Sequence, residues 1–212
     1  MKTLTLTIAF LMITLTGFTQ VDRFTAAMQK GMTTIDSAKT SDDYLNAANY
    51  FERIAAAEQK QWLPNYYVAL GNLHAAMLGN QPGEAKDAIY DKAMTFIDKA
   101  EALMPNNSEI YALKAYVVFM KMSVSPQARA MTMIPQSAAL GEKAIALNAE
   151  NPRAYLVKGQ QIFYTPEAFG GGKAKAKPIL VLASEKFDNF KATGLEPNWG
   201  KSRCQSLVKQ VN

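Results

Sequence analysis

The side chains that most often carry catalysis or bind metals are rare in this chain. It has a single histidine, His74, and a single cysteine, Cys204, which lie 130 positions apart. A nucleophile needs a base and a group that orients the base, and a zinc site needs several His or Cys ligands. Neither set can be assembled, so the sequence predicts a protein that is not an enzyme and uses no cofactor. A single cysteine also cannot form an internal disulfide.

Methionine offers a second kind of chemistry. Met120 and Met122 form one Met-x-Met pair, and Met131 and Met133 form another. Thioethers prefer soft ions such as Cu(I), so four converging sulfur atoms could carry copper. Residues i and i+2 of a helix point apart, however, and methionine commonly fills gaps in an apolar core. The primary expectation is therefore no metal site, and a soft-metal carrier is the alternative function.

A run of glycine and lysine offers a third kind of chemistry, the binding of phosphate. Phe169 is followed by three glycines and then by Lys173, Lys175 and Lys177. The segment lacks the spaced Gly-Lys-Ser/Thr of a phosphate loop and follows no predicted strand, so we expect a tight turn. Residues 170–212 hold 8 basic and 3 acidic side chains. This basic end favours an acidic partner.

The elements that must position these residues follow a repeat. Residues 99–115 and 143–159 match without a gap, 44 positions apart. Leu103 corresponds to Leu147, and Tyr111 corresponds to Tyr155. Apolar residues recur at helical spacing elsewhere, and no run alternates for long enough to predict a strand. A fixed period of this kind is typical of a solenoid of stacked helix pairs.

The repeated stretch resembles the signature of the tetratricopeptide repeat (TPR). In the second copy Ala149 replaces the proline, and in a third copy, at Leu195, Arg203 stands where the aromatic residue is expected. The resemblance implies an all-α, right-handed αα-hairpin solenoid, here of about nine helices, that binds a protein or peptide on its concave face. The residues that fit the signature best are Ala100, Leu103, Pro105, Asn106, Tyr111 and Ala115.

The length of the repeat departs from the TPR pattern. A TPR unit has about 34 residues, whereas this period is 44. Because the matching residues flank the turn between units, the extra residues fall between the two helices of each unit. The resulting long intra-repeat insertions, at 79–88, 124–133 and 165–178, should emerge along one edge, and longer helices should absorb some of their length.

The first helix of each pair would line the concave face. Its tyrosines, such as Tyr67, are expected to pack inside the repeat, which leaves polar residues as contact candidates. The predicted partner-binding residues are Asn72, Lys114, Lys158 and Gln161, together with Lys173, Lys175 and Lys177.

Residues 1–19 are typical of a secretory signal peptide. Lys2 precedes an apolar run, and the small residues Gly17 and Thr19 precede a cut before Gln20. The run is shorter than the roughly 20 residues of a membrane span, and we expect no transmembrane segment after its removal. Residues 20–212 are predicted to form a single TPR-like domain, since 49% of the chain is hydrophobic.

The function predicted from these observations is that of a non-catalytic protein- or peptide-binding scaffold. The signal peptide places it outside the cytoplasm, as a periplasmic or secreted protein of the cell envelope. Its partner would be another exported or envelope protein or peptide, and nucleic acid is not expected as a ligand.

Overall fold

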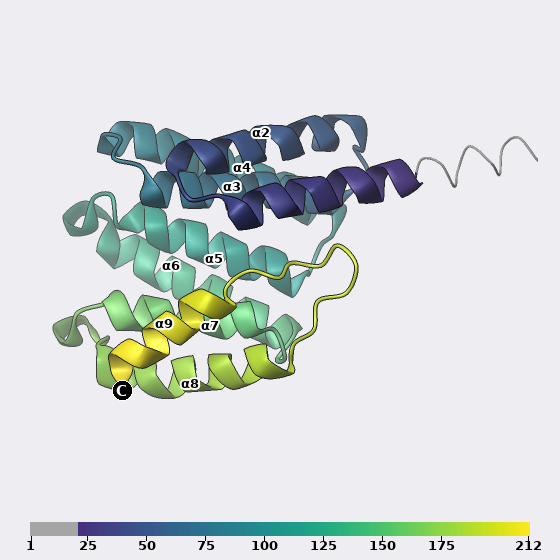
Figure 1. Ribbon diagram of the computed structural model, residues 1–212. Coiled ribbons are helices and arrows are strands. Elements are labelled where there is room, and N and C mark those ends of the chain that lie inside the picture. The colour runs from purple at the N-terminus through teal and green to yellow at the C-terminus, as the bar shows by residue number, and fades with distance from the viewer. Residues whose placement is uncertain (1–20) are drawn as a thin grey trace, which may run out of the picture.

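The structure is a computed structural model that describes residues 21–212. These residues form nine α-helices and one 3-10 turn and contain no strand, which confirms the predicted all-α class (Figure 1). The predicted signal peptide lies outside them. Within the same range, no helix has both the length and the apolar character of a membrane span. A first helix covers residues 21–37, and the others are α2 (Ser41–Ala57), α3 (Trp62–Leu78), α4 (Gly83–Leu103), α5 (Ser108–Met122), α6 (Pro126–Leu147), α7 (Pro152–Tyr164), the 3-10 turn η1 (Glu167–Phe169), α8 (Lys173–Asn189) and α9 (Lys201–Val211).

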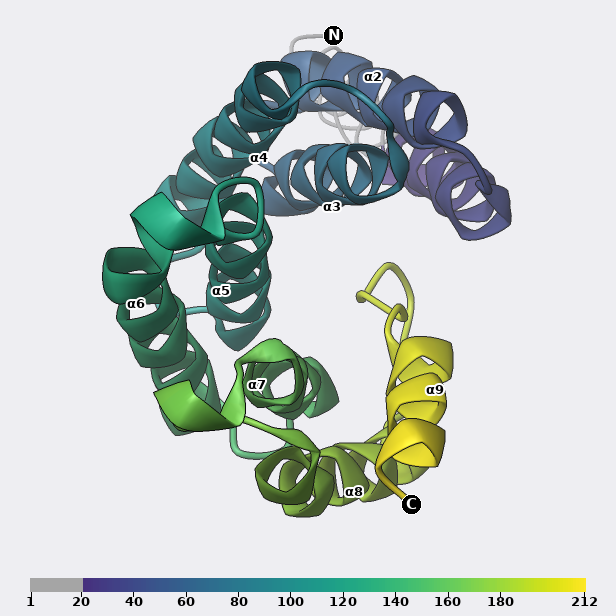
Figure 2. The same cartoon turned by 90° about the vertical axis from the view of Figure 1, so that its left-hand side faces the viewer.

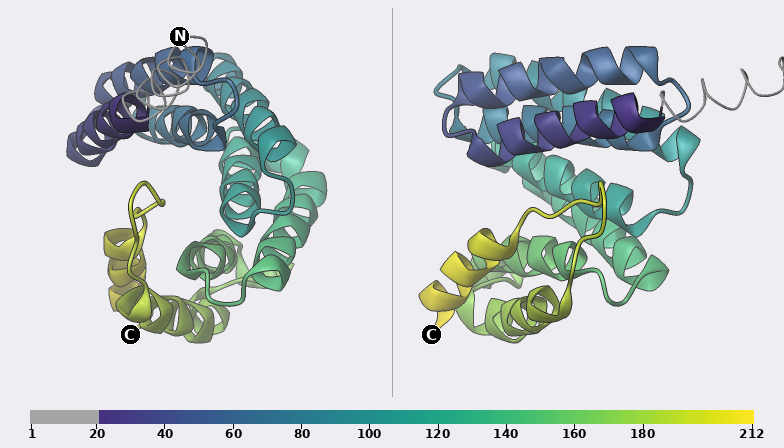
Figure 3. Two further views of the ribbon diagram at one scale, coloured as in Figure 1. Left: turned by 90° about the vertical axis from the view of Figure 1, so that its right-hand side faces the viewer. Right: turned by 45° about the vertical axis from the view of Figure 1, so that its right-hand side comes forward.

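The helices form an open ring of pairs, with one helix of each pair inside and the other outside. α3, α5 and α7 lie on the inner side, and α4, α6 and α8 lie on the outer side (Figure 2). α3 and α5 each pack against the outer helix that follows and against the next inner helix, and α7 packs against α8. The N-terminal helices and α9 face each other across the opening (Figures 2 and 3). The fold is thus a repeat-like helical array, and its right-handed sense stays a prediction.

The repeated Asn/Pro turns set the starts of the inner helices. The Asn107 side chain accepts hydrogen bonds from backbone N–H groups at the start of α5, and the Asn151 side chain does the same for α7. Such caps satisfy N–H groups that the first turn of a helix leaves without partners. Asn151 Nδ2 also donates to Ser108 Oγ at 2.9 Å. The same residue therefore starts α7 and ties it to α5.

Longer helices absorb much of the extra repeat length. The segment 124–133, predicted as an insertion, is mostly helical because α6 already begins at Pro126. Proline is favourable at the first helical position, whereas Pro135, inside α6, removes one backbone hydrogen bond. The third insertion behaves in the same way, since α8 takes in its last residues. The buried residues of α6 begin only at Ser137, so its first turns project beyond the core.

Two main apolar cores support the ring, and a small third cluster joins α5, α6 and α7. The larger lies mainly among the first helix and α2–α5, and the smaller lies among α7, α8 and α9. Trp199, just before α9, packs against both. A buried ion pair also joins α5 to α7, because Arg153 is 1% exposed and donates to Glu109 from Nε at 2.6 Å and from Nη2 at 2.8 Å. The site described next lies between the two cores, at the other end of these helices.

Candidate functional site

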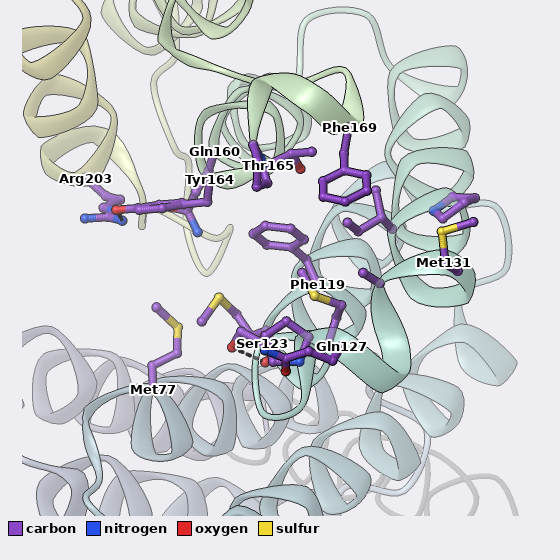
Figure 4. Close-up of a pocket in the computed structure, with 17 residues that line it drawn as sticks. Met77, Phe119, Ser123, Gln127, Met131, Gln160, Tyr164, Thr165, Phe169 and Arg203 are labelled. Atoms are coloured by element: carbon purple, nitrogen blue, oxygen red, sulfur yellow. Dashed lines mark hydrogen bonds between the residues drawn. The ribbon is translucent and has the colours of Figure 1, made fainter.

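A pocket of about 780 Å³ opens between the C-terminal ends of α5 and α7 and the first turns of α6. Its volume falls within the roughly 300–1,000 Å³ typical of small-molecule sites. Figure 4 shows its side chains arranged around the space. They are Met77, Phe119, Met120, Met122, Ser123, Pro126, Gln127, Ala130, Met131, Ile134, Pro135, Gln160, Tyr164, Thr165, Pro166, Phe169 and Arg203.

One wall consists of the end of α5 and the first turns of α6. Phe119, from α5, points towards the centre of the pocket (Figure 4). On α6, Ala130 and Ile134 are four positions apart and so share one face of the helix, which lines the pocket. Met131, at the rim, is 80% exposed. The projecting part of α6 therefore offers an apolar face to a ligand.

The turn after α7 builds the opposite wall. It brings Phe169 to the rim, where this side chain is 72% exposed. Gly170 and Gly172 adopt positive φ values of 87° and 106°. At Gly171 a Cβ atom would lie 2.1 Å from the carbonyl oxygen of Thr165, so only glycine lets the chain pass this close. The glycine run is the tight turn predicted from the sequence, and it holds Phe169 beside the pocket.

Polar side chains lie at the end of the pocket next to α9. Arg203 comes from α9, and Gln160 and Tyr164 come from α7 (Figure 4). Arg203 Nε donates to Gln160 Oε1 at 3.0 Å, and Arg203 Nη2 donates to the Tyr164 hydroxyl at 2.8 Å. Within the described part of the chain, Arg203 is the single charged residue of the lining. The site is thus an apolar pocket with one cation at its end.

A solved structure, that of the HusA haemophore from Porphyromonas gingivalis, resembles this chain over most of both proteins. The two share 31% sequence identity with a TM-score of 0.80, and the match covers 89% of this chain and 92% of that one. The chain belongs to the HusA haemophore family. No family model matches it, and no curated protein does. The relative is a binding protein by its name, which agrees with a non-catalytic binding function.

The methionines predicted as alternative copper ligands are partly gathered here. Met120, Met122 and Met131 line the pocket together with Met77, whereas Met133 is not part of the lining. The structure therefore does not bring all four predicted sulfur atoms to one place. In residues 21–212, His, Cys, Asp and Glu side chains also form no cluster of three or more that could hold a metal ion.

The seven predicted partner-binding residues lie outside the pocket. Asn72 is 1% exposed and donates to Val68 O within α3, and Gln161 is 6% exposed and donates to Ile134 O. These two side chains serve the packing of the helices. Lys114 and Lys158 form ion pairs with carboxylates of the outer helices.

The three lysines at the start of α8 are exposed. Lys173 lies 5.7 Å from the centre of the Phe163 ring, and Lys175 donates to Gly170 O at 3.2 Å. Lys177 is exposed on the same helix. Cations at a helix N-terminus interact unfavourably with the helix dipole. Stabilisation of α8 therefore does not explain the presence of the three lysines. Their binding to an acidic partner stays a prediction.

His74 and Cys204 lie in different surroundings. His74 lines a second hollow of about 250 Å³, together with Tyr44 and Trp199. Cys204 is buried in the smaller core, where burial raises the pKa of its thiol to about 11. A thiol of this kind is unreactive at neutral pH. The structure therefore shows no thiolate nucleophile at Cys204.

Sequence reasoning did not identify the pocket, although it singled out three of its residues, Met120, Met122 and Met131, as alternative copper ligands. Phe119 and Tyr164 stand near the ends of inner helices, where the repeat pattern does not extend. Phe169 and Met131 belong to segments that were predicted as insertions. That prediction was the available sequence signal for a site at this edge of the array. Arg203 was recognised only as a departure from the repeat.

Proposed function

We propose that this chain is a non-catalytic binding protein whose pocket takes haem or a related porphyrin. The observation that carries the proposal is an apolar pocket of about 780 Å³ in a chain that is 31% identical to a haemophore. Each Å² of apolar surface that is removed from water on binding contributes about 25 cal/mol of favourable free energy. A flat apolar macrocycle would bury a large area between the two walls.

The side chains of the lining suit such a ligand. Phe119, Tyr164 and Phe169 offer flat rings for stacking, and the methionines can adapt their shape to the ligand. Methionine and tyrosine are also among the residues that ligate haem iron in proteins. The candidates here are the methionines of the lining and Tyr164, because His74 faces the other hollow.

A pocket-filling substitution tests this function. Ala130 lies on the lining face of α6, and Ala130→Trp should occupy the space between the walls. Haemin is titrated into the purified protein and followed by absorbance. We expect the variant to bind haemin at least about tenfold more weakly than the unmodified protein does. A loss of about 1.4 kcal/mol of binding free energy is enough for a tenfold change in Kd.

Ala139→Trp is the matched control. Ala139 is exposed on the same helix and is not part of the lining. It should bind haemin as the unmodified protein does. The proposal is wrong if the unmodified protein does not bind haemin, or if both tryptophan variants bind it equally well.

We also propose that the chain is exported, on the basis of residues 1–19. The signal-peptide pattern ends with Gly17 and Thr19 before Gln20. Mass spectrometry of the protein from its native host should therefore find a chain that begins at Gln20. A chain that retains Met1 in the cytoplasm would contradict this proposal.

A further inference from the structure

The guanidinium of Arg203 is held at the end of the pocket by neutral partners. Its Nε donates to Gln160 Oε1 at 3.0 Å, and its Nη2 donates to the Tyr164 hydroxyl at 2.8 Å. Its central carbon lies 5.7 Å from the centre of the Tyr164 ring. Both partners belong to α7, so the guanidinium is fixed in place, and neither partner cancels its charge.

No carboxylate of residues 21–212 pairs with Arg203, in contrast to two other arginines of the chain. Arg129 pairs with Asp87 at 2.5 Å, and Arg153 pairs with Glu109 at 2.6 Å. The planar fork of arginine fits a carboxylate through two parallel hydrogen bonds. A cation beside an apolar surface is poorly solvated unless an anion accompanies it. The end of the pocket is therefore suited to an anion that the ligand would bring.

The repeat gives an independent reason to single out Arg203. Tyr111 follows Leu103 by eight positions, Tyr155 follows Leu147 by eight, and Arg203 follows Leu195 by eight. The pattern of the repeat thus calls for an aromatic residue at this position. At this position Arg203 instead places a charge at the end of the pocket, between it and the second hollow.

We propose that Arg203 binds a carboxylate of the ligand and makes the pocket select anionic over uncharged porphyrins. This inference rests on the proposed function and narrows its ligand class to apolar macrocycles that carry a carboxylate. Haem has two propionate groups, one of which would accept hydrogen bonds from the guanidinium. The apolar walls supply most of the affinity, and Arg203 supplies the selectivity.

The experiment compares haemin with its dimethyl ester, in which both carboxylates are masked. Each is titrated into the unmodified protein and into Arg203→Met, which keeps an apolar side chain of similar length. A hydrogen bond to a charged group contributes enough for the unmodified protein to prefer haemin by about 10- to 100-fold. Arg203→Met should bind haemin and the ester with similar affinity. Arg203→Lys should retain part of the preference because it keeps the charge.

Lys209→Met is the matched control. Lys209 is an exposed cation on α9 outside the pocket, so this variant removes the same charge and should keep the full preference. Circular dichroism shows whether each variant is folded, and the ester comparison in the unmodified protein needs no variant. If the unmodified protein binds both compounds equally, or Arg203→Met keeps the preference, the role of Arg203 is refuted while the pocket remains a porphyrin site. If the unmodified protein binds neither compound, the proposed function itself fails.

Discussion

His74 shows how burial changes the chemistry of a single residue. It is the only histidine of the chain, and its ring lies against that of Tyr44 with 5.0 Å between the ring centres. Burial lowers the pKa of His74 from its usual value to about 4. Asp36 and Arg203 line the same hollow, but the loss of solvent accounts for the shift. The imidazole is therefore neutral in the folded protein at physiological pH.

We expect acid to destabilise the protein through His74. The folded-state pKa of about 4 lies below the usual histidine pKa of 6.5, so between these values the unfolded state binds more protons. The contribution of His74 to stability is thus fully present above about pH 6.5 and is lost as the pH falls towards 4. Urea denaturation at pH 7 and pH 5 measures the free energy of unfolding at the two pH values. His74→Gln should lose less stability between the two pH values than the unmodified protein loses.

Tyr44→Phe provides the control for this comparison. It alters the ring against which His74 packs without removing a group that titrates between pH 5 and 7. Its stability should depend on pH as that of the unmodified protein does, since carboxylates elsewhere contribute equally to both. An identical pH dependence in His74→Gln and the unmodified protein would mean that the imidazole is not desolvated.

At the scale of elements, the repeat predicted the order and starts of the inner helices well. The signal is local, because an asparagine before each helix caps it whatever the neighbouring unit does. Asn107 and Asn151 both act in this way. Small residues such as Ala100 and Ala144 are fully buried, as the repeat signature requires. The starts of α5 and α7 and the buried small residues therefore followed from the sequence, whereas the repeated leucines Leu103 and Leu147 are exposed.

The pocket did not follow from the sequence, because it depends on where long helices end. Pro126 and Pro135 favoured an irregular insertion, yet α6 starts at the first and continues through the second. Its exposed first turns become a wall only because the turn after α7 lies opposite them. Side chains from several units meet there, at positions that have no fixed sequence spacing. The composition of the insertions pointed to this edge, but it could not identify Phe119 or Arg203.

At the scale of the whole molecule, the helices leave the ring open, and the segment 190–200 closes it by contacts with α3. It leaves the end of α8, runs back to α3 and then enters α9 (Figures 1 and 3). Tyr67 donates its hydroxyl to Leu195 O at 3.4 Å, and Trp199 Nε1 donates to the Tyr66 hydroxyl at 2.7 Å. The Trp199 ring also stacks on Tyr116, with 6.1 Å between the ring centres. These contacts join the last helix to the N-terminal half of the chain.

The closure also positions the polar end of the pocket. Arg203 lies in the first turn of α9, directly after this segment. Gly200, with a φ of 106°, makes the turn, and a Cβ atom there would lie 2.9 Å from Leu156 Cδ2 and from Phe187 Cζ. The chain is therefore held tightly on both sides of Trp199. Loss of this tryptophan should affect the pocket as well as the core.

We expect Trp199→Ala to weaken both stability and haemin binding. Truncation of a buried aromatic residue costs about 3–5 kcal/mol, and the partly buried Trp199 should fall at the lower end. Affinity should fall because α9 no longer holds Arg203 beside Gln160. Trp199→Phe keeps a ring but removes the N–H donor, so it should cost about 1–3 kcal/mol and retain most of the binding. Urea denaturation and haemin titration measure the two effects.

Trp62→Ala separates the two effects of Trp199. Trp62 begins α3 and packs edge-on against Tyr66, with 5.7 Å between the ring centres, but it does not belong to the segment that closes the ring. It should lower stability while leaving the haemin affinity of the folded protein unchanged, because α9 keeps its place. If Trp199→Ala also leaves the affinity unchanged, the contacts of α9 with α7 and α8 are sufficient to hold it at the pocket. The closing segment would then contribute to the stability of the ring and not to the geometry of the site.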